Sequence, residues 1–117
     1  MAVHNELGEW GERCAEEYLR RKGYVILERD WQSGHRDIDI IALDGSVVVF
    51  VEVKTRHNRV FGSPEVSVDY RKIKNLQAAA NHYVKYRRIA YELRFDIVSV
   101  VGEVGTEPDI EHIENAF

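Results

Sequence analysis

The sequence has one cysteine, two prolines and no long apolar run, and each of these shortages excludes a class of protein. Cys14 has no cysteine partner, so it forms no internal disulfide and suggests no thiolate zinc site, which fits a reducing compartment. No stretch approaches the roughly 20 apolar residues of a membrane helix. The opening MAVHNELGEW also lacks the basic and apolar regions of a signal peptide. We therefore expect a cytoplasmic protein.

The length and composition predict one folded domain. The chain has 117 residues, which is enough for one compact core and too few for two ordinary domains. Hydrophobic residues make up 44% and charged residues 31%, as in soluble globular proteins. We expect a single domain over residues 1–117, with a mobile acidic tail from about residue 103.

The formal net charge of −4 hides a separation of charge along the chain. From Lys54 to Arg88 there are nine basic and two acidic residues, a local balance of +7. From Glu92 onward Arg94 is the one basic residue, against seven acidic residues. A phosphate backbone responds to the local field, so the middle of the chain is a candidate nucleic-acid surface. The alternative is an ordinary solvated helix with its basic residues facing outward.

The segment 37–54 predicts a β-hairpin. Two strand-forming runs, DIDIIAL and SVVVFVEVK, flank the Asp44-Gly45 pair, which is a strong signal for a two-residue turn. Such a turn would place Leu43 opposite Ser46. This register then decides which side chains share a face of the sheet.

Alternation along the two strands separates an apolar face from a mixed one. The mixed face is apolar near the turn and carries charged residues at its open end, namely Asp37, Asp39, Glu52 and Lys54. The apolar face collects Ile38, Ile40, Ala42, Val47, Val49, Val51 and Val53. Three acids and a lysine are therefore expected to converge on one face.

The rest of the chain predicts helices on either side of this hairpin in sequence. Apolar residues at three- and four-residue spacing indicate helices over 4–22 and about 69–87, the second capped by Asp69. Residues 24–29 and 93–101 are rich in strand formers, and a weak final strand over 109–113 is also expected. The order α-β-β-β-α-β indicates an α/β fold, a mixed sheet flanked by helices.

The charged open end suits a metal centre. We expect Asp39 to lie one diagonal step across the hairpin from Glu52, where the two carboxylates can share one Mg²⁺ or Mn²⁺. Lys54 would then position the attacking water or stabilise charge on a phosphate. The alternative is a solvated cross-strand ion-pair patch. The apolar surroundings of Asp39 and Glu52 favour the site, because an unpaired charge in such a run is costly.

Several blocks in order resemble the YraN family of small bacterial proteins. They are GEWGERCAEEYLRRKGY, DIDIIA, VFVEVKTR, FGSP and RFDIV, which together span nearly the whole chain. That family is assigned to the PD-(D/E)xK nuclease superfamily and is similar to archaeal Holliday junction resolvases. The resemblance implies a restriction-endonuclease-like fold, with Asp39 as the motif aspartate and Glu52-Val53-Lys54 as E-x-K.

The same resemblance implies further site residues. Glu12 matches an acidic residue that resolvase-like nucleases bring from the first helix as a metal ligand; the alternative is an ordinary surface glutamate. The family usually has Gly-Glu where this chain has Arg36-Asp37, which leaves the role of Asp37 open. Resolvase-like enzymes commonly pair to cut two strands, so a homodimer is expected.

Two functions remain after these steps. The first is a Mg²⁺- or Mn²⁺-dependent endonuclease that hydrolyses phosphodiester bonds of DNA, at branched or distorted sites by analogy with resolvases. The second is a nucleic-acid-binding module with the same fold and little or no turnover. In either case we expect phosphate contacts from basic residues near the site, namely Arg56, Arg59 and Lys72.

Overall fold

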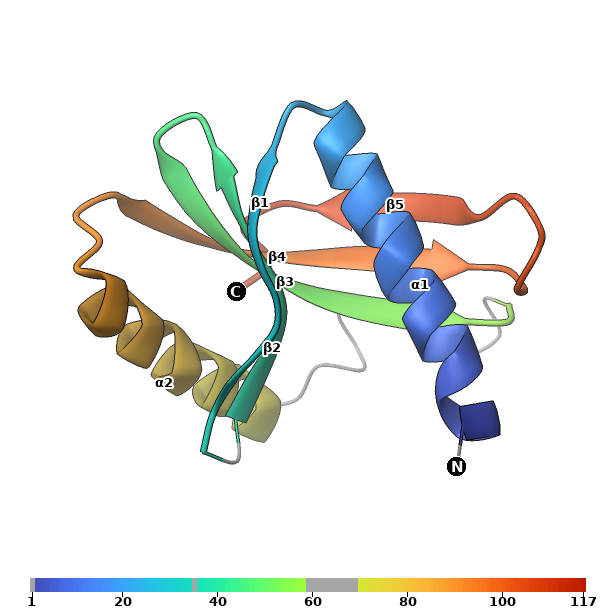
Figure 1. Cartoon of the computed structure of the whole chain (residues 1–117), viewed down its shortest axis with the longest axis horizontal. Coiled ribbons are helices and arrows are strands. Elements are labelled where there is room, and N and C mark those ends of the chain that lie inside the picture. Colours follow the sequence, from blue (N-terminus) through green and yellow to red (C-terminus); the bar gives the residue numbers. More distant parts are fainter. Residues whose placement is uncertain (1, 35, 59–69) are drawn as a thin grey trace.

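The computed structural model describes residues 2–34, 36–58 and 70–117. Its elements follow one another as a helix, three strands, a helix and two strands (Figure 1). They are α1 (Ala2–Arg21), β1 (Val25–Ser33), β2 (Arg36–Asp44), β3 (Val47–Arg56), α2 (Tyr70–Arg87), β4 (Glu92–Val101) and β5 (Asp109–Ile113). The fold class is α/β as predicted, and the arrangement is consistent with a restriction-endonuclease-like fold. Asp69, the expected cap of the second helix, lies outside the described residues.

Five strands form one mixed sheet in the order β1-β2-β3-β4-β5, and its two faces carry separate cores. β3 and β4 are parallel, whereas the other neighbours are antiparallel. Trp10, Ala15 and Leu19 of α1 pack on one face, against side chains that include Val49 and Val98. The core on the other face joins α2 to the sheet and includes Leu76, Ala80, Tyr83, Ile41, Val48 and Phe50.

No helix among residues 2–34, 36–58 and 70–117 is long and apolar enough to span a bilayer.

The hairpin forms, but its register differs from the predicted one by two residues. Leu43 lies opposite Val48 rather than Ser46, so the turn is Gly45-Ser46. Gly45 has a φ of 61°, which suits the first central position of a type II′ turn. The prediction was wrong because it placed glycine second in the turn. A shift of two residues preserves the alternation along β3, so Val49 and Val51 face α1 while Val48 and Phe50 face α2.

The predicted face of Ile38 is also wrong. Ile38 packs in the α2 core, whereas Ile40, two residues along the same strand, packs in the α1 core. Strict alternation would have placed both on one face, so β2 is irregular between them. The neighbouring β1 also departs from regular geometry, because Asp30 has a φ of 49° and the β1–β2 register shifts between Ile26 and Glu28.

The segment after residue 103, which was expected to be mobile, includes a strand that pairs with the sheet. β5 pairs antiparallel with β4, which confirms the weak final strand. Beyond β5, the amide of Ala116 donates to the carbonyl of Phe95 at 2.7 Å. The ring of Phe117 packs 6.0 Å from the ring of Phe95. These contacts fix the acidic end of the chain against the edge of the sheet.

Candidate functional site

The site lies where β2 and β3 separate. These strands pair regularly from Asp44 opposite Val47 to Ile40 opposite Val51. Beyond it, the backbone N–H of Val53 donates to the carboxylate of Asp39 at 2.8 Å. In Figure 1, β1 and β2 bend away together from β3, β4 and β5. A carboxylate therefore occupies the fork of the sheet.

Three carboxylates from three elements converge at this fork. Glu12 comes from α1, Asp30 from β1 and Asp39 from β2, and one oxygen from each lies within 4.8 Å of the others. Asp30 is exposed, whereas Glu12 and Asp39 are half-buried. The left-handed backbone of Asp30 belongs to the irregular stretch of β1, and aspartate tolerates this conformation better than most residues do. The irregular strands thus bring together acids that regular alternation would separate.

Burial and neighbouring negative charges favour protonated carboxyls in this cluster. Burial, followed by the charge of Glu52, raises the pKa of Asp39 to about 7, although the hydrogen bond from Val53 opposes the change. Burial, followed by a hydrogen bond with Asp30 and the charge of Asp39, raises the pKa of Glu12 to about 8. Carboxyls whose pKa rises in this way are expected where a cation is bound, because the cation supplies the missing positive charge.

A close approach of α1 to β3 sets the position of Glu12. A Cβ atom added to Gly11 would lie 2.0 Å from Oγ1 and 2.8 Å from Cβ of Thr55. Only glycine allows the helix backbone to come this near to the strand. Glu12, the next residue, is thereby carried toward the fork.

Glu52 lies near Asp39 and contacts α2, and Lys54 lies beside Glu52. The side chain of Glu52 is buried, and its Oε2 lies 3.4 Å from Nζ of Lys54 and 3.0 Å from Nζ of Lys72. Lys72 belongs to α2, whereas Asp39 is grouped with Glu12 of α1. Asp39 nevertheless lies near enough to Glu52 for the two charges to interact.

The donor set suits a hard divalent cation. Carboxylate oxygens are the ligands that Mg²⁺ and Mn²⁺ prefer, and these cations bind through a few carboxylates while retaining water molecules. Glu12, Asp30 and Asp39 offer three such oxygens, and a cavity of about 180 Å³ adjoins two of them, lined by Glu9, Glu12, Arg13, Arg29 and Asp30. The residues present thus fit the expected metal.

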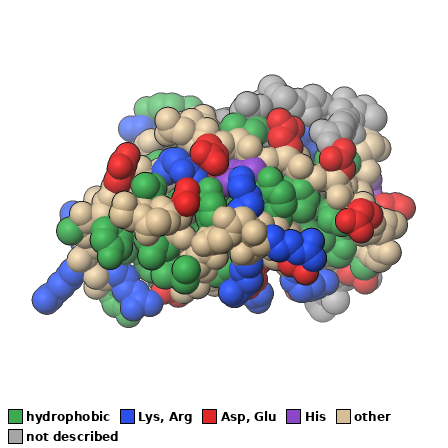
Figure 2. Space-filling model, turned by 90° about the horizontal axis from the view of Figure 1, so that it is seen from above, with side chains coloured by type: hydrophobic (Ala, Val, Ile, Leu, Met, Phe, Trp, Pro, Cys, Tyr) green, Lys and Arg blue, Asp and Glu red, His purple; other side chains and the backbone are tan. Residues whose placement is uncertain are grey.

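The expected phosphate-binding residues are separated in the fold. Arg56 ends β3 and lines a cavity of about 420 Å³ with Leu7, Thr55, His57 and Asn58. Lys72 pairs with Glu52 from α2. Arg59 lies outside the described residues. Figure 2 shows that acidic and basic side chains are interspersed on the face seen from above, so among the coloured side chains this view displays no region of one sign.

A second group of charged side chains is buried in the α1 layer, away from the fork. Asp96 is fully buried and accepts hydrogen bonds from Arg94 at 2.9 Å and from the amide of Asn115 at 3.0 Å, while Nε2 of His112 lies 2.7 Å from it. Burial opposes ionisation, but the hydrogen bonds from His112 and Arg94 hold the pKa of Asp96 below its ordinary value. This group ties β4 to β5 and the end of the chain.

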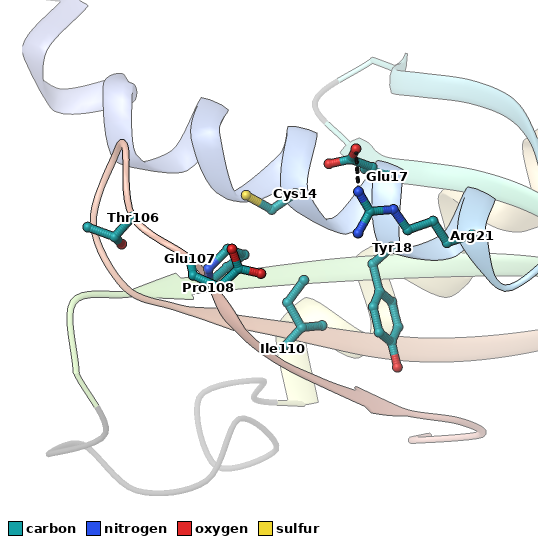
Figure 3. A pocket seen from close by; sticks show the side chains of 8 residues that line it. All are labelled: Cys14, Glu17, Tyr18, Arg21, Thr106, Glu107, Pro108 and Ile110. Carbon is teal, nitrogen blue, oxygen red and sulfur yellow. Dashed lines mark hydrogen bonds and ion pairs between the residues drawn. The ribbon is translucent and has the colours of Figure 1, made fainter.

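Figure 3 shows another cavity beside α1. It has a volume of about 480 Å³ and lies between α1 and the segment 106–110. Cys14, Tyr18 and Ile110 line it, and the ion pair between Arg21 and Glu17 borders it. Cys14 is partly buried and also packs against the α1 core. The cavity does not adjoin the carboxylates at the fork.

Sequence reasoning identified Asp39, Glu52, Lys54 and Glu12, and the structure places all of them at or beside the fork. Asp30 was missed, because it lies beyond the predicted end of the first strand at residue 29 and outside the motifs. Asp37 is exposed and lines a small cavity beside Glu52. A count of acids near the predicted sheet end would have included Asp30, but nothing in its sequence context distinguishes it.

Comparisons with known proteins agree on one family. The model of "Uncharacterised protein family UPF0102" matches residues 11–100. A "UPF0102 protein" of Bacteroides thetaiotaomicron is 48% identical over 117 residues, covering 100% of this chain and 96% of the relative. One from Syntrophomonas wolfei is 47% identical over 116 residues, covering 98% and 100%. One from Thermodesulfovibrio yellowstonii is 44% identical over 112 residues, covering 96% of both.

Proposed function

The chain belongs to the UPF0102 family, which is the YraN family, and we propose that it is a divalent-metal-dependent endonuclease acting on DNA. The observation that carries the proposal is the convergence of Glu12, Asp30 and Asp39 within 4.8 Å at the fork of the sheet. Three carboxylates so close together repel one another unless a cation or protons neutralise them. The proposed substrate, branched or distorted DNA, is suggested by the resemblance to resolvases.

In this proposal Glu12, Asp30 and Asp39 hold the cation, and Glu52 adds a ligand from β3. The hydrogen bond from Val53 to Asp39 orients that carboxylate and leaves its other oxygen available. When bound, a divalent cation supplies Lewis-acid polarisation of a phosphoryl oxygen. The buried position of Glu52 limits its contact with water and strengthens its interactions with charged partners.

Lys54 has a different role in the proposed reaction. Its ammonium lies 3.4 Å from Glu52, so it stands beside the carboxylates without competing as a ligand. From there it can donate a hydrogen bond to the attacking water or to a phosphate oxygen as negative charge develops. Its side chain is 19% exposed, so the ammonium can contact a substrate that approaches from solvent while it stays beside Glu52. A pair of copies, each cutting one strand, would extend the activity to both strands of a junction.

The second candidate is a nucleic-acid-binding module with little or no turnover. One observation favours it: Glu52 is held by two lysines and is not among the three carboxylates that converge. A module of this kind would bind DNA with an affinity that falls as the salt concentration rises, but would not cleave it.

A cleavage assay separates the two candidates. Duplex, single-stranded, flap and four-way-junction DNA are incubated with the protein and Mg²⁺ or Mn²⁺, beside the Glu52→Ala and Lys54→Ala variants. The endonuclease predicts cleavage of at least one substrate, lost in both variants, with metal binding retained in Lys54→Ala. Metal binding without cleavage of any substrate would favour the binding module.

A further inference from the structure

The contact between Glu52 and Lys72 joins the proposed site to α2. Both Lys54 and Lys72 approach the same oxygen of Glu52, Oε2, and Lys72 is the nearer at 3.0 Å. The two lysines differ in exposure, since the side chain of Lys54 is 19% exposed and that of Lys72 is 48% exposed. Lys72 is thus the partner nearer to solvent. Because Glu52 is buried, its carboxylate needs a positive partner, which a bound cation would supply if Lys72 left.

A small cavity lies beside this contact, between β2 and α2. Its volume is about 130 Å³, roughly ten times the space that one water molecule requires. Besides Glu52 and Lys72, its lining contributes the donors of Arg36 and Asn75 and the carboxylate of Asp37. The cavity thus offers two positively charged side chains and a side-chain amide next to the proposed metal ligand.

Arg36 carries a polar atom that lacks an acceptor. Its Nε is buried and has no hydrogen-bond partner among the described residues. Buried donors without an acceptor are uncommon in folded proteins, because each costs the free energy of losing water. A phosphate oxygen suits such a donor, since arginine binds phosphate groups through several N–H bonds.

We propose that this cavity binds a phosphate group of the nucleic-acid strand, and that Glu52 exchanges Lys72 for the divalent cation and so frees Lys72 to contact that phosphate. The inference rests on the proposed function and assigns a substrate-binding role to Arg36, Lys72 and Asn75. Before exchange, the charges of Glu52 and Asp37 balance those of Arg36 and Lys72. After exchange, the cation adds two positive charges beside the cavity, which then attracts an anion.

The exchange makes an unusual prediction for Lys72. Replacing it with methionine keeps most of the side-chain volume and removes the competitor for Glu52. Lys72→Met should therefore bind Mn²⁺ more tightly than the wild type, by about threefold or more, the scale of one partly exposed ion pair. Lys74→Met makes the same change two residues along α2, where Lys74 lies over the ring of Tyr70, 5.3 Å from its centroid. This control should leave Mn²⁺ affinity unchanged.

The phosphate site is tested with a labelled duplex at constant ionic strength, in EDTA and in Ca²⁺, which also takes carboxylate ligands. The wild type and Lys74→Met should bind the duplex more tightly in Ca²⁺ than in EDTA. In Arg36→Ala and Lys72→Met, this increase in duplex affinity should be smaller than in the wild type by a factor of at least about three. The Mn²⁺ titration of the same variants supplies a readout that needs no cleavage.

The outcomes separate this inference from the proposed function. A wild type that binds no Mn²⁺ overturns both. A wild type that binds Mn²⁺ with the same affinity as Lys72→Met overturns the exchange and leaves the proposed function standing. If Arg36→Ala and Lys72→Met gain as much duplex affinity in Ca²⁺ as the wild type does, the phosphate site is overturned.

Discussion

The contact between Gly11 and Thr55 offers a direct test of how the fold positions the site. In Gly11→Ala, the new Cβ would lie 2.0 Å from Oγ1, 2.6 Å from Cγ2 and 2.8 Å from Cβ of Thr55. Carbon atoms in contact normally stay about 3.5–4.0 Å apart. Rotation of Thr55 moves Oγ1 and Cγ2 but leaves its Cβ in place. The helix must therefore shift from the strand by roughly 1 Å.

The expected cost follows from two opposing effects. Overpacking of this kind destabilises by about 1–3 kcal/mol. Alanine also favours a helix over glycine by roughly 1 kcal/mol, which offsets part of that loss. We expect Gly11→Ala to lower the free energy of unfolding by about 1 kcal/mol, and to weaken Mn²⁺ binding because the helix shift moves Glu12 relative to Asp39. Urea denaturation and Mn²⁺ calorimetry measure the two effects.

Gly8→Ala is the matched control in the same helix. A Cβ at Gly8 would meet nothing within 4 Å, so this variant should gain up to about 1 kcal/mol from helix propensity and keep its Mn²⁺ affinity. Thr55→Ala should restore part of the stability of Gly11→Ala, since it removes the two nearest atoms. A Gly11→Ala protein as stable as Gly8→Ala would refute the close approach of α1 to β3.

Three further predictions address charge. The pKa values of about 7 for Asp39 and about 8 for Glu12 mean that Mn²⁺ must displace protons when it binds. The affinity for Mn²⁺ should therefore rise between about pH 6 and pH 8 and then level off. Calorimetry in buffers of different ionisation enthalpy should detect the released protons. Because both carboxyls bind protons more tightly in the folded chain than in the unfolded one, the metal-free protein should lose stability as pH rises from their ordinary pKa values of 3.8 and 4.5 to about 8. A pH-independent Mn²⁺ affinity contradicts these raised pKa values. Asp30→Asn should keep the fold, because asparagine tolerates a positive φ, yet bind Mn²⁺ several-fold more weakly; an unchanged Mn²⁺ titration would remove Asp30 from the site. Asp96→Asn should cost about 3–5 kcal/mol in thermal unfolding because it leaves Arg94 and His112 without their buried partner, whereas the exposed Glu111→Gln should stay within about 0.5 kcal/mol of the wild type.

The sequence predicted the elements of this fold more reliably than their geometry. Alternation of valines and charged residues in 46–54 correctly separated Val49 and Val51 from Glu52. The predicted turn was one residue out, which shifts the register by two. Asp44-Gly45 and Gly45-Ser46 are both acceptable turns, and only packing of the whole hairpin selects between them. The error did not affect β3, since an even shift preserves alternation.

The candidate site was less accessible to sequence reasoning because it depends on irregular backbone. Ile38 changes face, and Asp30 adopts a left-handed conformation, as strand patterns would not predict. These two departures bring Asp39 to Glu12 and Asp30. The contact between Glu52 and Lys72 joins residues 20 positions apart through packing of α2, which no local pattern encodes. Motif resemblance identified Glu12, whereas its helical spacing alone left an ordinary surface glutamate equally acceptable.

The central claim is that the carboxylates at the fork hold a divalent cation, and a Mn²⁺ titration of the wild type and Asp39→Asn tests it most directly. Asp39 is the residue common to the three-carboxylate cluster and the neighbourhood of Glu52. Asparagine keeps an oxygen to accept the hydrogen bond from Val53, so the fold should persist. The account predicts Mn²⁺ binding by the wild type, weakened at least about tenfold in the variant. A wild-type protein that binds no Mn²⁺, or a variant that binds it equally well, would contradict the account.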